Sequence, residues 1–259
     1  MQPWRTLEEL DTPEGTLALR QRGERDFLLT IDGRVLMSSM LHRSEDALSR
    51  LAIERIEDRP RPRVLTAGLG LGFTLRALLD VVGRGAQVDV GELHEPIVRW
   101  CRGPLASVNG NAASDPRVRV ILGDVMDRVR EAAHDASRRY DAIVVDLMEG
   151  PSRGRARVNG HLYGSKALAS VRAALSPGGV YAVWGEEPDP SFVELLQRSG
   201  FDARKVVVGS GPKHVVYVAQ PAVARGRSND VVPRGGELPH GKPSSLPSEG
   251  ADIRRRQRR

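Results

Sequence analysis

One apolar segment that breaks into three evenly spaced glycines constrains this 259-residue chain more than any other feature. Residues 64–67 read Val-Leu-Thr-Ala, glycines follow at 68, 70 and 72, and leucines at helical spacing come next. This order is typical of a strand, a tight turn and a helix N-terminus, where an α/β sheet brings its backbone close to a ligand. Glycine suits such a turn because a side chain would block that approach. We therefore predict that Gly68, Gly70 and Gly72 bind a nucleotide-like ligand.

Strand and helix patterns alternate from residue 63 onward. The predicted strands are 63–67, 86–91, 117–122, 140–146 and 179–184, and the predicted helices are 72–82, 95–102, 124–135, 165–175 and 190–199. Two further strands, near 204–209 and 213–219, flank the turn residues Gly-Ser-Gly-Pro. This succession favours an α/β fold with a mostly parallel, doubly wound sheet and an antiparallel edge strand.

A small antiparallel sheet is predicted ahead of this domain. Residues 16–37 form short alternating runs, and the pair Asp32-Gly33 between apolar runs is a strong hairpin signal. A helix capped by Ser44 is expected to run to about residue 58. We therefore divide the chain into an N-terminal β-hairpin domain (1–43), a nucleoside-binding α/β catalytic domain (44–220) and a basic tail (221–259).

The high net charge lies in that tail. Residues 221–259 carry nine Lys or Arg and four Asp or Glu, which accounts for +5 of the chain's net +6. The tail is rich in Gly, Pro and Ser, so we expect it to be disordered and to contact nucleic acid weakly, if at all. The single cysteine, Cys101, fits a reducing compartment. With neither a signal-peptide pattern nor an 18-residue apolar stretch, we expect a cytoplasmic protein that has no membrane partner.

Polar or acidic residues follow the next three predicted strands, at the sheet edge where such folds bind ligands. Glu92 comes 20 residues after Gly72, and its paired acceptors suit the two hydroxyls of a ribose. Gly123 and Asp124 follow the third strand, and Asp146 ends the fourth. Asp124 can accept from an adenine amine, or can simply cap the next helix. Glu92 and Asp146 also have ordinary alternatives, as a loop carboxylate and a turn cap.

The spacing of the glycines narrows the ligand. A dinucleotide fingerprint needs glycine at position 73, where this chain has Phe73. A phosphate-binding Gly-Lys-Ser/Thr sequence is absent. The G-x-G-x-G spacing favours an S-adenosyl ligand and the Rossmann-like fold of S-adenosylmethionine-dependent methyltransferases. His and Cys residues lack metal-ligand spacing, so we predict no metal site.

The order of motifs resembles the spermidine/spermine synthase family of polyamine aminopropyltransferases. The resemblance covers roughly residues 15–219. Its segments are V-L-T-A-G-L-G-L-G-F-T-L-R (64–76), G-E-L-H-E-P-I-V (91–98), D-P-R-V-R-V-I-L-G-D (115–124), Y-D-A-I-V-V-D (140–146), H-L-Y-G-S-K-A-L (161–168) and L-S-P-G-G-V (175–180).

The resemblance implies a role for each of these residues. It assigns the ribose to Glu92, the adenine to Asp124 and the catalytic-base role to Asp146. It also places Glu149 and Tyr163 at the substrate. The implied co-substrate is decarboxylated S-adenosylmethionine or S-adenosylmethionine itself, without a metal. The implied partners are a small amine acceptor and, by the family's habit, a second copy of the chain in a homodimer.

The chain departs from the family's pattern around the amine-binding positions. The family's glycine loop carries an aspartate where this chain has Leu71, and its glutamine after the Asp-Gly turn is replaced by Leu36. Its tyrosine-bearing segment before the first domain helix becomes Ser-Ser-Met-Leu-His-Arg-Ser-Glu, residues 38–45. The acceptor therefore stays open. Two other functions stay open as well: an S-adenosylmethionine-dependent methyltransferase, and a catalytically silent nucleoside-binding or regulatory protein.

Overall fold

The computed structural model describes residues 2–40, 43–147, 150–151, 160–209 and 214–222. The chain divides into two compact units, Met1–Val223 and Ala224–Arg259, and the second unit lies outside the described residues. The predicted tail lies outside them from residue 223 on. Within the described part, no helix is long and apolar enough to cross a membrane.

A four-stranded antiparallel sheet comes first. It consists of β1 (Arg5–Thr12), β2 (Gly15–Arg22), β3 (Asp26–Ile31) and β4 (Arg34–Ser38), paired in chain order. The β3–β4 turn places Asp32 at φ 47° and Gly33 at φ 76°, as expected of a two-residue hairpin turn whose positive φ values match the twist of the strands. The predicted hairpin is thus confirmed. Strand β1 was not predicted, since its sequence, Arg-Thr-Leu-Glu-Glu-Leu-Asp-Thr, is rich in charged residues and shows no clear alternation of apolar and polar residues.

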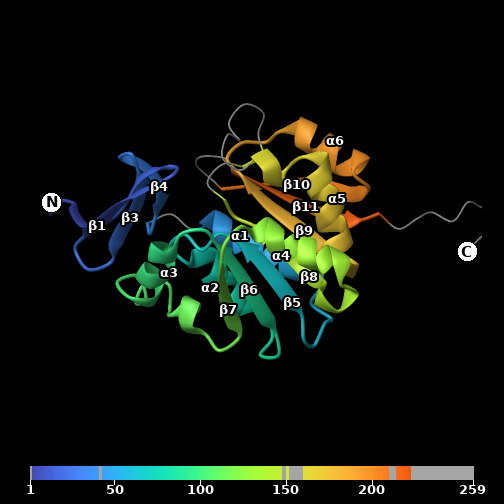
Figure 1. Cartoon of the computed structure of the whole chain (residues 1–259), viewed down its shortest axis with the longest axis horizontal. Coiled ribbons are helices and arrows are strands. Elements are labelled where there is room, and N and C mark those ends of the chain that lie inside the picture. The colour runs from blue at the N-terminus through green and yellow to red at the C-terminus, as the bar shows by residue number, and fades with distance from the viewer. Residues whose placement is uncertain (1, 41–42, 148–149, 152–159, 210–213, 223–259) are drawn as a thin grey trace, which may run out of the picture. The chain divides into compact units, whose positions relative to one another are not determined.

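The larger sheet has seven strands in the order β10-β11-β9-β8-β5-β6-β7 (Figure 1). Its strands are β5 (Arg63–Ala67), β6 (Gln87–Glu92), β7 (Val118–Leu122), β8 (Tyr140–Val145), β9 (Leu175–Gly185), β10 (Phe201–Val208) and β11 (His214–Pro221). Pairing is parallel from β7 to β9, so the sheet is mostly parallel as predicted. The antiparallel strand is β11, which lies between β9 and β10, one position in from the edge.

Helices cover both faces of this sheet (Figure 1). They are α1 (Arg43–Ile53), α2 (Phe73–Val81), α3 (Glu95–Arg102), α4 (Val125–His134), α5 (Ser165–Ala174) and α6 (Pro190–Arg198), with single turns η1 (Ala112–Ser114), η2 (Ala136–Arg138) and η3 (Gly160–Leu162). One apolar cluster joins α1, α2 and α3 to the sheet and to Leu17, Leu19, Phe27 and Leu29 of the N-terminal sheet. A second joins α4, α5 and α6 to the other face. Burial on both faces explains the apolar strand runs.

The first helix is shorter than the sequence predicts. It begins at Arg43, so Ser44 lies in its first turn and is not its cap, and it ends at Ile53 instead of near residue 58. Beyond Ile53 the chain tightens into turns, with the Ile56 amide donating to the Ile53 carbonyl at 2.8 Å. Ile56 is still buried. The apolar spacing therefore continues past the end of the helix, and for this reason the predicted helix was too long.

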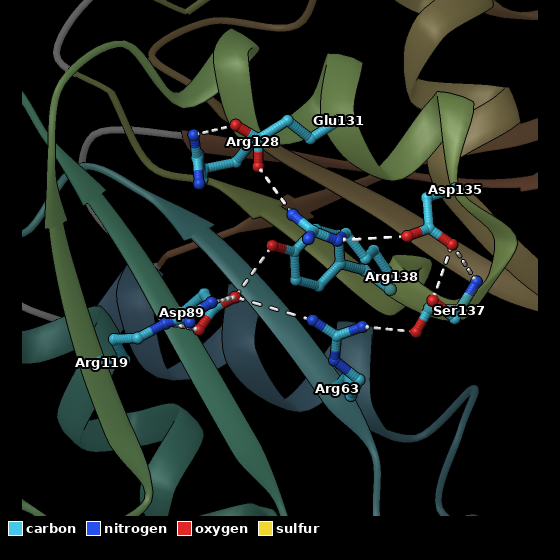
Figure 2. A network of polar contacts seen from close by, with 9 residues as sticks. Arg63, Asp89, Arg119, Arg128, Glu131, Asp135, Ser137 and Arg138 are labelled. Atoms are coloured by element: carbon cyan, nitrogen blue, oxygen red, sulfur yellow. Dashed lines mark hydrogen bonds and ion pairs between the residues drawn. The ribbon is translucent and has the colours of Figure 1, made fainter.

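A buried carboxylate ties four strands together near their N-terminal ends (Figure 2). Asp89 of β6 accepts two hydrogen bonds from Arg119 of β7, at 3.0 and 2.8 Å, and one from the Tyr140 hydroxyl of β8 at 2.9 Å. Arg63 of β5 lies 3.9 Å from the same carboxylate. Because the strands are parallel, this network lies at the end of the sheet opposite the predicted ligand edge. The network therefore stabilises the strands whose opposite ends carry the predicted site residues.

The N-terminal sheet is fixed to α3 by a second acidic residue. Glu8 of β1 accepts hydrogen bonds from two Arg99 nitrogens at 2.8 Å and from the Trp100 indole at 2.6 Å. These donors, Arg99 first, lower the pKa of Glu8 to about 2. The residue therefore stays ionised down to strongly acidic pH, and the contact with α3 persists over the same range.

Candidate active site

The glycine loop between β5 and α2 comes close to the end of β8. Gly68 has φ +82°, and its amide donates to the Gly91 carbonyl at 2.8 Å. A Cβ added at Gly68 would lie 3.0 Å from the backbone oxygen of Asp146, tighter than almost all real contacts of that kind. Any larger residue would also be strained at this φ. Glycine at position 68 therefore allows the loop and Asp146 to be neighbours.

A buried asparagine packs against the glycine loop. Asn109 is fully buried, and its Nδ2 donates to the carbonyls of Leu71 at 3.2 Å and Cys101 at 3.4 Å. A Cβ at Gly72, which precedes α2 with φ +87°, would lie 2.8 Å from this same nitrogen. The third glycine of the loop is thus needed for packing. Asn109 was not predicted, because the local sequence Ser-Val-Asn-Gly-Asn signals only a turn.

Glu92 ends β6 with its carboxylate against the glycine loop. The side chain is buried; Oε2 accepts from the Leu69 amide at 2.8 Å, and Oε1 accepts from the His94 amide at 2.9 Å. Each carboxylate oxygen keeps a second acceptor position, so the group can hold the loop and still bind hydroxyls. Both predicted possibilities, a loop carboxylate and a ribose ligand, are compatible with this geometry.

Replacing Glu92 with glutamine is expected to weaken nucleoside binding about 5- to 100-fold. The amide nitrogen of glutamine cannot accept, so one of the two backbone amides it faces loses its partner, at a cost of about 1–3 kcal/mol. Titration calorimetry with methylthioadenosine measures the loss. Glu95→Gln, an exposed carboxylate on α3, is the matched control. An affinity unchanged by Glu92→Gln would show that the carboxylate does not shape the nucleoside site.

Asp124 takes the helix-capping role that the sequence left open. It is the N-cap of α4, where its Oδ1 accepts from the Met126 amide at 2.8 Å. Its Oδ2 lies 3.4 Å from Nε2 of His161 in η3. Gly123 precedes it with φ +131°, and a Cβ there would meet open space. The cap fixes the direction of the carboxylate, and an adenine contact stays a prediction.

Asp146 directly follows β8 and is half-buried. Its amide donates to the Ala67 carbonyl at 3.3 Å, and its Oδ2 accepts from the Thr74 hydroxyl of α2. Burial and, to a smaller extent, the charge of Glu45 on α1 raise the pKa of Asp146 to about 7, although the Thr74 hydrogen bond acts in the opposite direction. The carboxyl therefore gains and loses its proton near neutral pH, which is the range in which a general base is most effective.

Two residues beside Asp146 were not predicted. Glu45 lies in the first turn of α1, is buried, and accepts a hydrogen bond from its neighbour Ser44 at 2.7 Å. Thr74 is the second residue of α2 and is also buried. A carboxylate on the buried face of an amphipathic helix is a recognisable signal, because such groups are rarely buried unless they have a partner. Nothing in the sequence shows that α1 and α2 meet at the end of β8.

The part of the loop that departs from the family's pattern is apolar in space as well. Leu71 is fully buried in the cluster that α1, α2 and α3 share with the N-terminal sheet. Leu36 and Met37 of β4 pack against the same cluster, and a Cβ at Gly70 would overlap the Met37 sulfur. A carboxylate that could hold an ammonium group at position 71 is thus replaced by hydrocarbon.

The remaining predicted residues are placed as follows. Tyr163 is buried, and its ring packs edge-on against Phe192 with 5.8 Å between ring centroids. This is a packing role, and contact of Tyr163 with substrate stays a prediction. Glu149 lies outside the described residues. Among the residues that are described, no group of three or more His, Cys, Asp or Glu side chains is arranged to hold a metal ion.

Comparisons with known proteins lead to one family. No family model matches the chain. The chain is similar to the polyamine aminopropyltransferase of Mycobacterium tuberculosis, with 34% identity over 125 residues, or 48% of this chain and 23% of that protein. The spermidine synthase structure from Thermotoga maritima aligns with a TM-score of 0.67 and 16% identity, over 84% of this chain and 73% of that one. The chain is therefore similar to spermidine synthases and polyamine aminopropyltransferases.

The likeness to solved spermidine synthase structures concerns the fold. A spermidine synthase in complex with the transition state analogue AdoDATO also aligns, with a TM-score of 0.66, 16% identity and the same coverage. At this identity the structures show the fold alone. The chain spans about a quarter of the length of the mycobacterial relative that it matches. The Rossmann-like sheet preceded by a small antiparallel sheet is therefore established, and the activity is a matter for proposal.

Proposed function

We propose that the chain is a spermidine synthase-like transferase that alkylates an amine acceptor from an S-adenosyl donor, with Asp146 as the base. One observation carries this proposal: a carboxylate whose pKa is about 7 lies at the end of β8, beside the glycine loop. The protein's relatives, named polyamine aminopropyltransferase and spermidine synthase, support the reaction class.

The residues of the loop edge suit the nucleoside half of such a donor. Glu92 offers two carboxylate oxygens beside the Leu69 amide, and Asp124 offers a carboxylate held by the cap of α4. These are the acceptors that ribose hydroxyls and an adenine amine need. A related spermidine synthase binds AdoDATO, which supports decarboxylated S-adenosylmethionine as the donor.

Asp146 would perform the proton transfer. A free alkylamine has a pKa of about 10, close to that of lysine, so it arrives as an ammonium ion that cannot attack. The ionised Asp146 carboxylate would hold this ammonium group and accept one proton from it, and the lone pair of the resulting neutral amine would then form the bond to the carbon beside the sulfonium. The carbon–sulfur bond breaks in the same step, and a neutral thioether leaves. The negative charge of Asp146 is thereby replaced by a neutral acid beside the newly alkylated amine.

The apolar surroundings of Leu71 favour one alternative. Without a carboxylate at this position, the site has lost the group that selects a donor whose tail ends in an amine. A donor that keeps its carboxylate, ordinary S-adenosylmethionine, then becomes a candidate, and the reaction would be methyl transfer. The third possibility, a silent nucleoside-binding protein, is less well supported because Asp146 and its neighbours are intact. The homodimer and the cytoplasmic location stay predictions.

Turnover of the full chain tests the proposal. The protein is incubated with decarboxylated S-adenosylmethionine and a panel of diamines, triamines and monoamines, and products are followed by mass spectrometry. We expect methylthioadenosine together with an amine that has gained an aminopropyl group. S-adenosylhomocysteine and a methylated product from S-adenosylmethionine would instead establish the methyltransferase alternative. Methylthioadenosine formed equally with and without any amine would contradict amine alkylation.

A further inference from the structure

We propose that Thr74 is a positioning residue, which fixes the carboxylate of Asp146 for proton transfer, and that Ser49 holds Thr74 in place. The inference rests on the proposed function, since it concerns the same base. It is carried by a chain of contacts that runs from α1 through α2 to the end of β8, outside the loop and acidic residues to which the sequence pointed.

Two hydrogen bonds connect Ser49 to Asp146 through Thr74. The fully buried Ser49 of α1 donates its hydroxyl to the backbone carbonyl of Thr74 at 3.2 Å. Thr74, which is 4% exposed, donates its own hydroxyl to Oδ2 of Asp146. Thr74 comes two residues after Gly72, so the turn that forms the ligand loop also delivers this hydroxyl. The position of the base is thereby coupled to the position of the loop.

A threonine suits this task better than a flexible donor. Its branched Cβ restricts χ1 to two main rotamers within a helix, so holding the hydroxyl in one direction costs little conformational entropy. Within the part of the chain that the structure describes, Thr74 is the hydrogen-bond donor to the Asp146 side chain. One carboxylate oxygen is therefore held, and Oδ1 is left for the substrate amine. A base held in this way spends less of its time in orientations that cannot react.

The same contact sets the proton affinity of the base. Enclosure of Asp146 and the charge of Glu45 both favour the protonated acid, whereas the Thr74 hydroxyl stabilises the carboxylate. Among the described residues, Glu45 is the charged group that acts on Asp146, and Thr74 opposes it from the facing helix. Loss of the hydroxyl is therefore expected to move the pKa of Asp146 upward and to leave less of the ionised base at neutral pH.

Thr74→Val is the decisive variant because it keeps the shape and removes the hydroxyl. We expect the acidic limb of the kcat/KM profile to move up by about 0.5–1 pH unit, the amount by which this hydrogen bond favours the carboxylate over the protonated acid. At pH 7 kcat is expected to fall about 10-fold, with the donor KM changed less than twofold. Thr74→Ser, which keeps the hydroxyl, should restore most of kcat. Thr66→Val is the matched control, since Thr66 is a buried threonine on β5 whose hydroxyl has no partner among the described residues.

A titration that needs no turnover separates this inference from the proposed function. The full chain, labelled with ¹³C at aspartate carboxyls, is titrated by NMR, and Asp146→Asn identifies the resonance. An upward shift in Thr74→Val, absent in Thr74→Ser and Thr66→Val, supports the inference even if no amine is alkylated. The same pKa of Asp146 in wild type, Thr74→Val and Thr74→Ser overturns it, whatever the activity. If Thr74→Val fails to fold, Thr74→Ala and Ser49→Ala take its place, and a pKa of Asp146 in both variants that is identical to wild type overturns the inference as well.

Discussion

Replacing Asp146 with asparagine is expected to lower kcat about 10²–10⁴-fold while leaving nucleoside binding nearly intact. The amide has almost the shape of the carboxylate, and its oxygen can still accept from the Thr74 hydroxyl, so the loop that it adjoins keeps its geometry. It can neither hold an ammonium group by charge nor accept its proton. Steady-state turnover with decarboxylated S-adenosylmethionine and the best amine of the panel measures the loss.

Two comparisons make this result specific. Methylthioadenosine should bind the variant within about threefold of the wild type, which separates a lost base from a lost site. Asp127→Asn removes a carboxylate on the exposed side of α4, so it should leave kcat unchanged. Full turnover by Asp146→Asn would remove this residue from the mechanism, and equal losses of turnover and nucleoside binding would assign it a structural role.

The same substitution is expected to stabilise the folded protein at neutral and basic pH. The pKa of Asp146 is about 7 in the folded chain, against an ordinary value of 3.8 for an aspartate in an unfolded chain. Below pH 4 the acid is protonated in both states, and wild type and variant should be equally stable. As pH rises from 4 to 7 the unfolded chain ionises first, so the carboxyl destabilises the wild type increasingly. Above pH 7 the penalty is constant.

The magnitude follows from the linkage between proton binding and folding. The difference between the folded and unfolded pKa of Asp146 corresponds to at most about 4 kcal/mol, and solvent contact with the half-buried group reduces it to roughly 1–3 kcal/mol. Urea unfolding of wild type and Asp146→Asn at pH 5 and pH 8 measures the difference. We expect the advantage of the variant to be larger at pH 8. An advantage that is the same at both pH values would show that the carboxyl ionises normally in the folded chain.

Much of the fold could be predicted because its signals are local. The alternation of apolar strand runs with amphipathic helices placed the elements of the large sheet within about four residues, as with β5 at Arg63–Ala67 and α3 at Glu95–Arg102. The Asp32-Gly33 turn was equally clear, since its two positive φ values favour these residue types. Parallel strands bring their carboxyl ends to one edge, so the neighbourhood of Gly68, Glu92 and Asp146 could be inferred as well.

What the sequence could not show depends on tertiary contacts. Strand β11 pairs directly with β9. The order of the elements along the chain does not reveal this pairing. Glu45, Thr74 and Asn109 gain their roles only where α1, α2 and the segment before η1 meet the loop. Glu92 and Asp124 each had two possible roles, and in the structure each carboxylate accepts a hydrogen bond from a backbone amide. Their contacts with a nucleoside stay predictions.

Measuring which S-adenosyl ligand the chain binds is the most direct test of the proposed chemistry. Titration calorimetry of the full chain should be carried out with decarboxylated S-adenosylmethionine, S-adenosylmethionine and methylthioadenosine under identical conditions. An S-adenosyl site that serves aminopropyl transfer should bind the decarboxylated donor more tightly than the carboxylated one, and should also bind methylthioadenosine. Binding of none of the three would contradict both the nucleoside site at Gly68–Gly72 and the transferase proposed from it.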